Sequence, residues 1–185
     1  MTTRTAPAHR LTVPVTERDH IRGQLGARFT LVEYGDYECP FCRAAHPVVE
    51  EVERRLNGQL CFAYRHFPIV NAHPHAVRAA EAAEAAGAQG RFWPMHDLLF
   101  ETTMGLADET LVRLAVQIGL DARRFVSDLA SNQYLDRIRE DMSSGARSGV
   151  NGTPTFFVNG LRHDGAHDAV SLIAALQRGA SAHSV

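Results

Sequence analysis

Two of the three cysteines in this 185-residue chain belong to one short motif, Cys39-Pro40-Phe41-Cys42. Two thiols at this spacing can form a disulfide within one helical turn, and they can also bind a metal ion. Three cysteines are too few for the disulfide framework that stabilises small secreted domains. In a reducing compartment such a pair is more often catalytic or metal-binding than structural.

The residues around the motif predict a redox role for it. Phe29 to Tyr34 is rich in β-branched and aromatic residues, as is typical of a buried strand, and the motif follows it at the start of a helix. Cys39 then lies at the amino terminus of the helix, where unpaired N–H groups and the helix dipole favour a thiolate. We expect Cys39 to attack disulfides and the more buried Cys42 to resolve the mixed disulfide.

Two further places in the chain could serve this chemistry. Glu33 lies inside the predicted strand, so we expect a buried carboxyl with a raised pKa that moves the proton of Cys42; a solvent-facing Glu33 is the alternative. Thr153-Pro154 leads into a second β-rich segment, where a proline removes a donor from the sheet. A cis bond there would leave the Thr153 backbone free to pair with an extended substrate, whereas a trans proline in a loop is the commoner arrangement.

Hydrophobic spacing and turn residues predict a single α/β domain with a helical insertion. The expected order is strand, helix, strand, a block of helices, two strands and a closing helix. The first three elements are a strand at Phe29–Tyr34, a helix at Pro40–Leu56 and a strand at Gln59–Arg65. The helical block begins at Ala76, and its last helix ends at Gly145. The last three elements are a strand at Thr155–Asn159, a strand that begins at Leu161 and a helix at Asp168–Arg178.

Composition and charge exclude several classes of protein. Hydrophobic residues make up 45% and charged residues 22% of the chain, as in ordinary globular domains. The net charge is −2 and no basic run is present, which argues against nucleic-acid binding. All 19 basic side chains are arginine, so Schiff-base chemistry on lysine is excluded. We see no signal peptide and no membrane span, and therefore expect a soluble cytoplasmic protein, or a periplasmic one whose signal has been removed.

The motif, the helical block and the second β-rich region together resemble the DsbA-like branch of the thioredoxin superfamily. The resemblance covers about residues 28 to 178 and rests on Val32–Cys42, Arg65–Pro68, Ala80–Gly87, Phe92–His96 and Ser148–Val158. It implies a thioredoxin-like fold, an α/β arrangement with a central mixed sheet flanked by helices. The helical insertion after the second core strand would span about 72–146, with a lead-in at 1–27 and a tail at 179–185.

The resemblance also implies an activity, thiol–disulfide exchange without a cofactor or a metal ion. Substrate proteins or small thiols would form a mixed disulfide with Cys39. The resemblance does not identify the partner that recycles the cysteine pair. The resemblance implies that Cys39 is the nucleophile, that Cys42 is the resolving thiol and that Glu33 is a buried acid. It implies substrate contacts at Pro40, Phe41, Thr153 and a cis Pro154.

Phe41 departs from the strongly oxidising periplasmic members, which carry a histidine between the cysteines. Without an imidazolium at that place the reduced form is less favoured, so we predict a more negative reduction potential than theirs. Two other functions stay open. One is a binding or redox-sensing module, because similar domains occur appended to membrane transporters, and the other is the glutathione-using branch, which generally lacks an intact cysteine pair.

The remaining cysteine, histidines and large aromatic residues favour structural roles. We expect Cys61 to be a buried, inert thiol and His46 to be half-exposed on its helix. Four histidines are expected at loops and helix caps rather than in a zinc or copper site, and three aromatic residues in the core of the helical block. The histidines are His66, His73, His75 and His96, and the aromatic residues are Phe92, Trp93 and Phe100.

Overall fold

A five-stranded sheet with the order β1-β3-β2-β4-β5 lies at the centre of the computed structural model, which describes residues 9–181. The first residues of the expected lead-in, 1–8, and the last of the expected tail, 182–185, lie outside the described residues. β2 and β3 are parallel and the other neighbouring pairs are antiparallel, so the predicted mixed sheet is confirmed. The strands are β1 (His20–Gly23), β2 (Phe29–Gly35), β3 (Leu60–His66), β4 (Thr155–Val158) and β5 (Leu161–His163).

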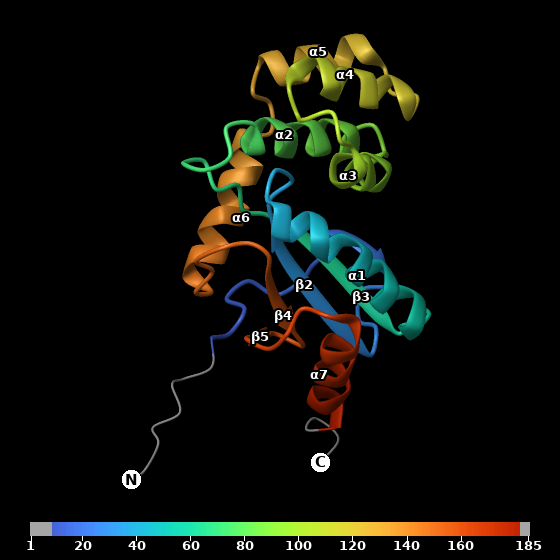
Figure 1. Cartoon of the computed structure of the whole chain (residues 1–185), viewed down its shortest axis with the longest axis vertical. Coiled ribbons are helices and arrows are strands. Elements are labelled where there is room, and N and C mark those ends of the chain that lie inside the picture. Colours follow the sequence, from blue (N-terminus) through green and yellow to red (C-terminus); the bar gives the residue numbers. More distant parts are fainter. Residues whose placement is uncertain (1–8, 182–185) are drawn as a thin grey trace.

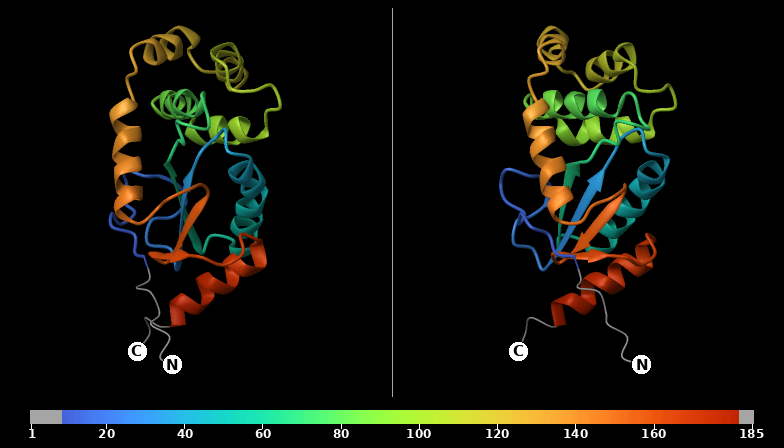
Figure 2. Two further views of the ribbon diagram at one scale, coloured as in Figure 1. Left: turned by 60° about the vertical axis from the view of Figure 1, so that its left-hand side comes forward. Right: turned by 90° about the vertical axis from the view of Figure 1, so that its left-hand side faces the viewer.

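Helices cover both faces of this sheet and form a cap beyond one end of it (Figure 1). The helices are α1 (Pro40–Leu56), α2 (Ala76–Gly87), α3 (Phe92–Glu101), α4 (Asp108–Gln117), α5 (Ala122–Ala130), α6 (Leu135–Arg147) and α7 (Ala169–Ser181). α1 and α7 pack on one face and α6 on the other, while α2 to α5 form the cap (Figure 2). Within residues 9–181, no helix combines the length and the apolar character needed to cross a membrane.

The alternation of side chains along β2 creates two separate cores. Phe29 and Leu31 face α1 and join the larger apolar cluster, whereas Val32 and Tyr34 face the opposite side and pack with Phe157. Both sides of the strand are buried, as expected for a central strand covered by helices. β2 is therefore held firmly, and the turn that follows it carries the cysteine motif.

The expected lead-in at 1–27 contains a strand, so that prediction is wrong for His20–Gly23. β1 pairs antiparallel with β3, with His20 opposite Tyr64. Nε1 of Trp93 donates a hydrogen bond to the carbonyl oxygen of Ile21 at 2.9 Å, which attaches this edge strand to the cap. The four residues of β1 are of mixed polarity, so their sequence gives little indication of a strand. An edge strand needs to be buried on one side only.

Gly145 does not end the last helix of the block, because α6 continues to Arg147. A Cβ atom at position 145 would lie 2.8 Å from the ring of Phe67 and 3.0 Å from the ring of Tyr34. The glycine therefore permits close packing of α6 on the sheet. Although α6 follows β3 with the other inserted helices, it covers the sheet and does not belong to the cap.

Three of the aromatic side chains that were expected inside the helical block lie where the cap meets the sheet. Phe92 and Phe100 are buried and Trp93 is partly buried. The ring centroid of Phe100 lies 4.8 Å from that of Tyr37, and the ring centroid of Trp93 lies 5.7 Å from that of Phe62. These contacts bury apolar surface between α3 and the core, so the cap is fixed relative to the cysteine motif.

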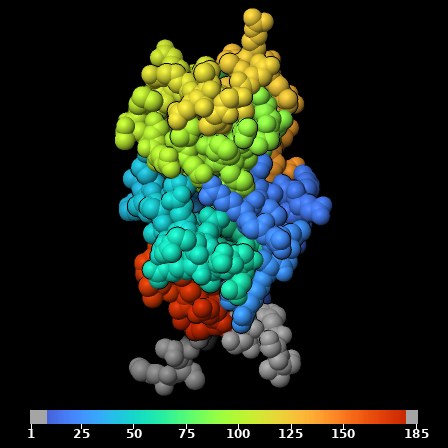
Figure 3. Space-filling model, turned by 90° about the vertical axis from the view of Figure 1, so that its right-hand side faces the viewer, coloured from blue at the N-terminus to red at the C-terminus, as the bar shows by residue number. Residues whose placement is uncertain are grey.

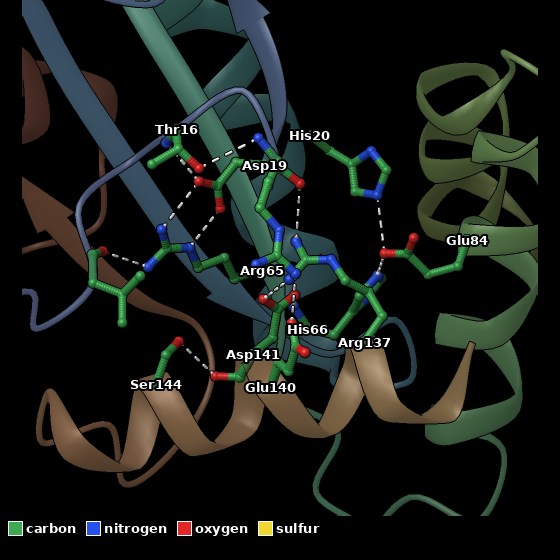
Figure 4. A network of polar contacts seen from close by, with 12 residues as sticks. Thr16, Asp19, His20, Arg65, His66, Glu84, Arg137, Glu140, Asp141 and Ser144 are labelled. Atoms are coloured by element: carbon green, nitrogen blue, oxygen red, sulfur yellow. Dashed lines mark hydrogen bonds and ion pairs between the residues drawn. The ribbon is translucent and has the colours of Figure 1, made fainter.

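A buried polar network also joins the cap to the sheet (Figure 4). Oε1 of Glu84 on α2 lies 2.9 Å from Nε2 of both His20 and His66. Burial favours the neutral acid, but the hydrogen bonds from the two histidines hold the pKa of Glu84 below its ordinary value. Oδ2 of Asp141 on α6 accepts a hydrogen bond from the backbone N–H of His66 at 3.0 Å. His66 is thus a buried residue at the end of β3, and its expected loop or cap position is wrong.

Candidate active site

Cys39 is the N-cap residue of α1, and Pro40 is the first residue of the helix. The tight turn after β2 is closed by the N–H of Cys39, which donates to the carbonyl oxygen of Asp36 at 3.1 Å. Proline suits this position because the first residues of a helix have no intrahelical acceptor for their N–H groups. The sequence therefore places a thiol at the positive end of a 17-residue helix.

Both thiols of the motif are free, and they differ in burial. Cys39 exposes 4% of its surface and Cys42 exposes none. Sγ of Cys39 lies 3.4 Å from the carbonyl oxygen of Thr153, and Sγ of Cys42 accepts a hydrogen bond from the N–H of Asp36 at 3.4 Å. Of the two cysteines, only Cys39 keeps any exposed surface.

The surroundings of the two sulfur atoms separate their pKa values. The hydrogen bond from the Cys42 thiol, a hydrogen bond from the Thr153 side chain and the N–H groups of Cys42 and Phe41 lower the pKa of Cys39 to about 5, against the opposing effect of burial. Burial raises the pKa of Cys42, and its hydrogen bond to Cys39 and the charge of Glu33 raise it further. At neutral pH the pair therefore holds one thiolate, at Cys39, and one thiol.

Glu33 lies on β2 and is 2% exposed, so it does not face solvent at a sheet edge. Its Oε1 atom is buried and has no hydrogen-bond partner. Burial, followed by the negative charge of Cys39, raises the pKa of Glu33 to about 8. Because the charge of Glu33 also raises the pKa of Cys42, the carboxyl lies near the buried thiol, and its own raised pKa lets it hold a proton at neutral pH.

The Thr153–Pro154 peptide bond is cis, and it lies between α6 and β4. β4 pairs antiparallel with β2, so the segment before Thr155 is directed toward the turn after β2, where Cys39 lies. Within residues 9–181 the N–H of Thr153 forms no hydrogen bond. The backbone of this segment thus offers a donor beside the Cys39 sulfur.

Pro40 and Phe41 lie at the surface between the two cysteines, and the Phe41 side chain is 72% exposed. A large apolar side chain that is this exposed next to a reactive sulfur can contact a bound molecule. Cys61, in contrast, lies within β3, is buried, and is paired with neither thiol of the motif. Burial raises its pKa, which leaves it protonated and unreactive at neutral pH.

Two residues near the motif were not assigned a role in the site from the sequence. Asp36 is buried, and its side chain accepts hydrogen bonds from the N–H groups of Glu38 and Ile69, both at 2.8 Å. His73 contributes a third bond to the same carboxylate, at 2.7 Å. An aspartate three residues before the first cysteine is a signal for a turn, but nothing in the sequence pairs it with His73.

The chain matches the thioredoxin family model over residues 15–178 and belongs to that family. It superposes on a thioredoxin-like oxidoreductase from Silicibacter pomeroyi with a TM-score of 0.79 and 29% identity, over 90% of this chain and 94% of that chain. With BdbD from Bacillus subtilis the TM-score is 0.83 at 19% identity, over 94% and 97%. With the thiol-disulfide exchange protein α-DsbA2 from Wolbachia pipientis it is 0.74 at 19% identity, over 91% and 88%. The predicted fold and the resemblance to DsbA-like proteins are confirmed.

Sequence relatives include proteins named Na⁺/H⁺ antiporter NhaA 1. The protein from Mycobacterium sp. (strain KMS) is 47% identical over 165 residues, which cover 88% of this chain and 27% of that protein. The protein from Salinispora arenicola (strain CNS-205) is 47% identical over 167 residues, which cover 90% and 26%. The chain thus spans about a quarter of the length of these curated relatives.

Proposed function

We propose that this chain is a thiol–disulfide oxidoreductase that cycles Cys39 and Cys42 between dithiol and disulfide. The observation that carries the proposal is the difference in pKa between the two cysteines. Cys39 is a thiolate at the N-terminus of α1 and accepts a hydrogen bond from the buried Cys42 thiol. A thiolate is the form of cysteine that attacks disulfides. The family match supports the same chemistry.

The reaction proceeds in two exchange steps. The Cys39 thiolate attacks a substrate disulfide, so that a Cys39–substrate disulfide forms and one substrate thiolate leaves. Cys42 then loses its proton and attacks Sγ of Cys39, which releases the second substrate thiolate and leaves a Cys39–Cys42 disulfide. Two electrons pass from the protein to the substrate, and the reverse sequence oxidises a substrate dithiol. Glu33 in its ionised form is suited to accept the Cys42 proton, since its pKa is about 8.

The substrates we propose are proteins or small thiols that form a mixed disulfide with Cys39. An extended peptide could pair with the free N–H of Thr153 beside Pro154, while its apolar side chains contact Phe41 and Pro40. The chemistry requires no organic cofactor. A partner that returns the pair to its starting state is needed for turnover.

Insulin reduction by dithiothreitol tests this proposal in the full chain. We expect the wild type to accelerate it, Cys39→Ser to lose the acceleration, and Cys42→Ser to accumulate a mixed disulfide that Cys39→Ser cannot form. Cys61→Ser is the matched control and should keep the wild-type rate, because this thiol is buried away from the motif. Acceleration that survives Cys39→Ser would refute the proposal.

The likeness to part of the antiporter-named proteins favours a second candidate, a redox-sensing module of a larger membrane protein. In that case the Cys39–Cys42 disulfide would form reversibly, but the chain would not accelerate insulin reduction. Glutathione-dependent isomerase or transferase chemistry is less well supported, because an intact cysteine pair is present and Cys42 lies within hydrogen-bond reach of Cys39.

A further inference from the structure

Two histidines and an aspartate from separate helices meet where the cap contacts the core. His46 lies on α1, and His96 and Asp97 lie on α3. One potential ligand atom from each of the three lies within 4.8 Å of the other two. The expected half-exposed position of His46 and loop or cap position of His96 are wrong, since the residues are only 7% and 2% exposed. Figure 3 shows the cap, coloured from green to yellow, directly against α1, in cyan.

His46 has a buried ring nitrogen without a hydrogen-bond partner. Its Nε2 lies 3.8 Å from Oδ1 of Asp97 and 4.0 Å from Oε1 of Glu50, both too far for a hydrogen bond. A buried polar atom without a partner is costly and requires an explanation. Two ligands at about 2.1 Å from a tetrahedral zinc ion are about 3.4 Å apart, so the spacing of Nε2 and Oδ1 suits two ligands of one ion.

The burial of both histidines favours the neutral imidazole, which is the form that binds a metal ion. Burial lowers the pKa of His46, and burial together with neighbouring positive charges lowers that of His96. A neutral imidazole need not lose a proton when it binds a metal ion. The hydroxyl of Tyr37 lies 3.0 Å from Nδ1 of His96, which orients this ring as metal-bound histidines are commonly oriented and leaves Nε2 for a ligand bond.

Carboxylates lie on the His46 side of this group, together with one guanidinium. Arg22 pairs with both oxygens of Asp97 at 2.5 Å and lies over the Trp93 ring at 4.4 Å. It is also paired with Glu53 at 3.4 Å, and the charges of Glu50 and Glu101 act on His46 as well. Three carboxylates, those of Glu50, Asp97 and Glu101, thus act on His46 against one arginine. A carboxylate can accept hydrogen bonds from arginine and still bind a metal ion through a remaining lone pair.

We propose that His46, His96 and Asp97 form a binding site for a divalent transition-metal ion of the zinc type. Three nitrogen and oxygen ligands with a fourth position left to water or Glu50 match the donor set that zinc accepts. The bound ion would link α1 to α3, and hence the core to the cap. The proposal does not depend on turnover at Cys39, because it uses neither thiol of the motif.

Cobalt(II) is the probe for this site in the full chain carrying Cys39→Ser and Cys42→Ser, in which the motif cannot bind the metal. We expect one equivalent of Co²⁺ to give ligand-field absorption between about 500 and 650 nm and to quench the fluorescence of Trp93. Trp93 is the single tryptophan of the chain, and its ring centroid lies 5.0 Å from that of His96. Zn²⁺ should displace Co²⁺ and reverse both signals.

His46→Gln in the same background should lose the absorption and the quenching. His163→Ala is the matched control, because His163 and His167, with ring centroids 6.2 Å apart, are a second histidine pair that could capture the ion. Both signals should persist in this variant. If His46→Gln does not fold, NMR spectra of the parent protein test the site instead, and the signals of His46 and His96 should shift when Zn²⁺ is added. The proposal would be overturned if the parent protein gave no Co²⁺ signal, or if the signal survived in folded His46→Gln. It would also be overturned if the signal were lost in His163→Ala, or if Zn²⁺ shifted only the NMR signals of other histidines.

Discussion

Nδ1 of His73 lies 2.7 Å from Oδ2 of Asp36, the residue whose N–H donates to the sulfur of Cys42. Burial lowers the pKa of His73, but the bond to Asp36 and the charges of Asp36 and Cys39 outweigh it and raise the pKa above its ordinary value. The segment between β3 and α2 thus brings a histidine close to the Cys39 thiolate. The residue between the cysteines next to Cys42 is Phe41, so the motif itself contains no imidazole.

Replacing this histidine should make Cys39 less acidic. His73→Ala removes an imidazole whose protonation Asp36 favours and leaves the buried carboxylate of Asp36 with backbone donors only, so we expect the pKa of Cys39 to rise by about 0.5–1 unit. Thiolate absorbance at 240 nm, followed against pH, measures this. His75→Ala is the control, because His75 is paired with the more exposed Glu38, and its pKa curve should match the wild type. An unchanged curve in folded His73→Ala would show that His73 does not act on the thiolate.

The hydrogen bond from Cys42 is the largest of the effects that lower the pKa of Cys39. With a pKa of about 5, Cys39 is mostly thiolate above pH 5, so its alkylation by iodoacetamide should rise between about pH 4 and 6 and then level off. Cys42→Ala removes the donor, and the midpoint should move up by at least about one unit. A midpoint near that of free cysteine in the wild type would contradict this account of the site.

Glu33 should make stability depend on pH. Its pKa is raised in the folded chain, from 4.5 to about 8, so the unfolded chain ionises first and stability falls as pH rises from about 4.5 to 8. Glu33→Gln removes this loss. The variant should gain in free energy of unfolding relative to the wild type across that range, by at most about 5 kcal/mol above pH 8. Urea unfolding at pH 5, 7 and 8.5 measures the gain, and a constant difference between the two proteins would refute it.

The sequence indicated the residues that gather at Cys39, because each is marked by its local context. The cysteines follow a strand at a helix start, Glu33 lies within that strand, and Thr153-Pro154 leads into the strand that pairs with it. The contacts of His46 and His73 could not be predicted in this way. They arise from the packing of α3 on α1 and from the course of the segment after β3, and no periodicity reports such distant contacts.

Errors in the predicted elements have a similar physical origin. β1 is short and lies at an edge, so only its pairing with β3 makes it a strand. Gly145 was expected to stop a helix because glycine often does so, yet here it provides the space that α6 needs against Phe67 and Tyr34. Local propensity was correct wherever burial on two sides reinforced it, as in β2 and β3.

The acidity of Cys39 also predicts where the reduction potential lies. Thioredoxin has a cysteine with a pKa of about 7 and a potential of about −270 mV, and DsbA has values of about 3.5 and −120 mV. A more stable thiolate favours the reduced form, so a pKa of about 5 predicts an intermediate potential, more negative than that of DsbA. Phe41→His would place a second imidazole beside the thiolate and should shift the potential in the positive direction. Equilibration with glutathione redox buffers measures both proteins. A wild-type potential near −120 mV, or a negative shift in Phe41→His, would contradict the argument, because either result would mean that thiolate stability does not set the potential of this pair.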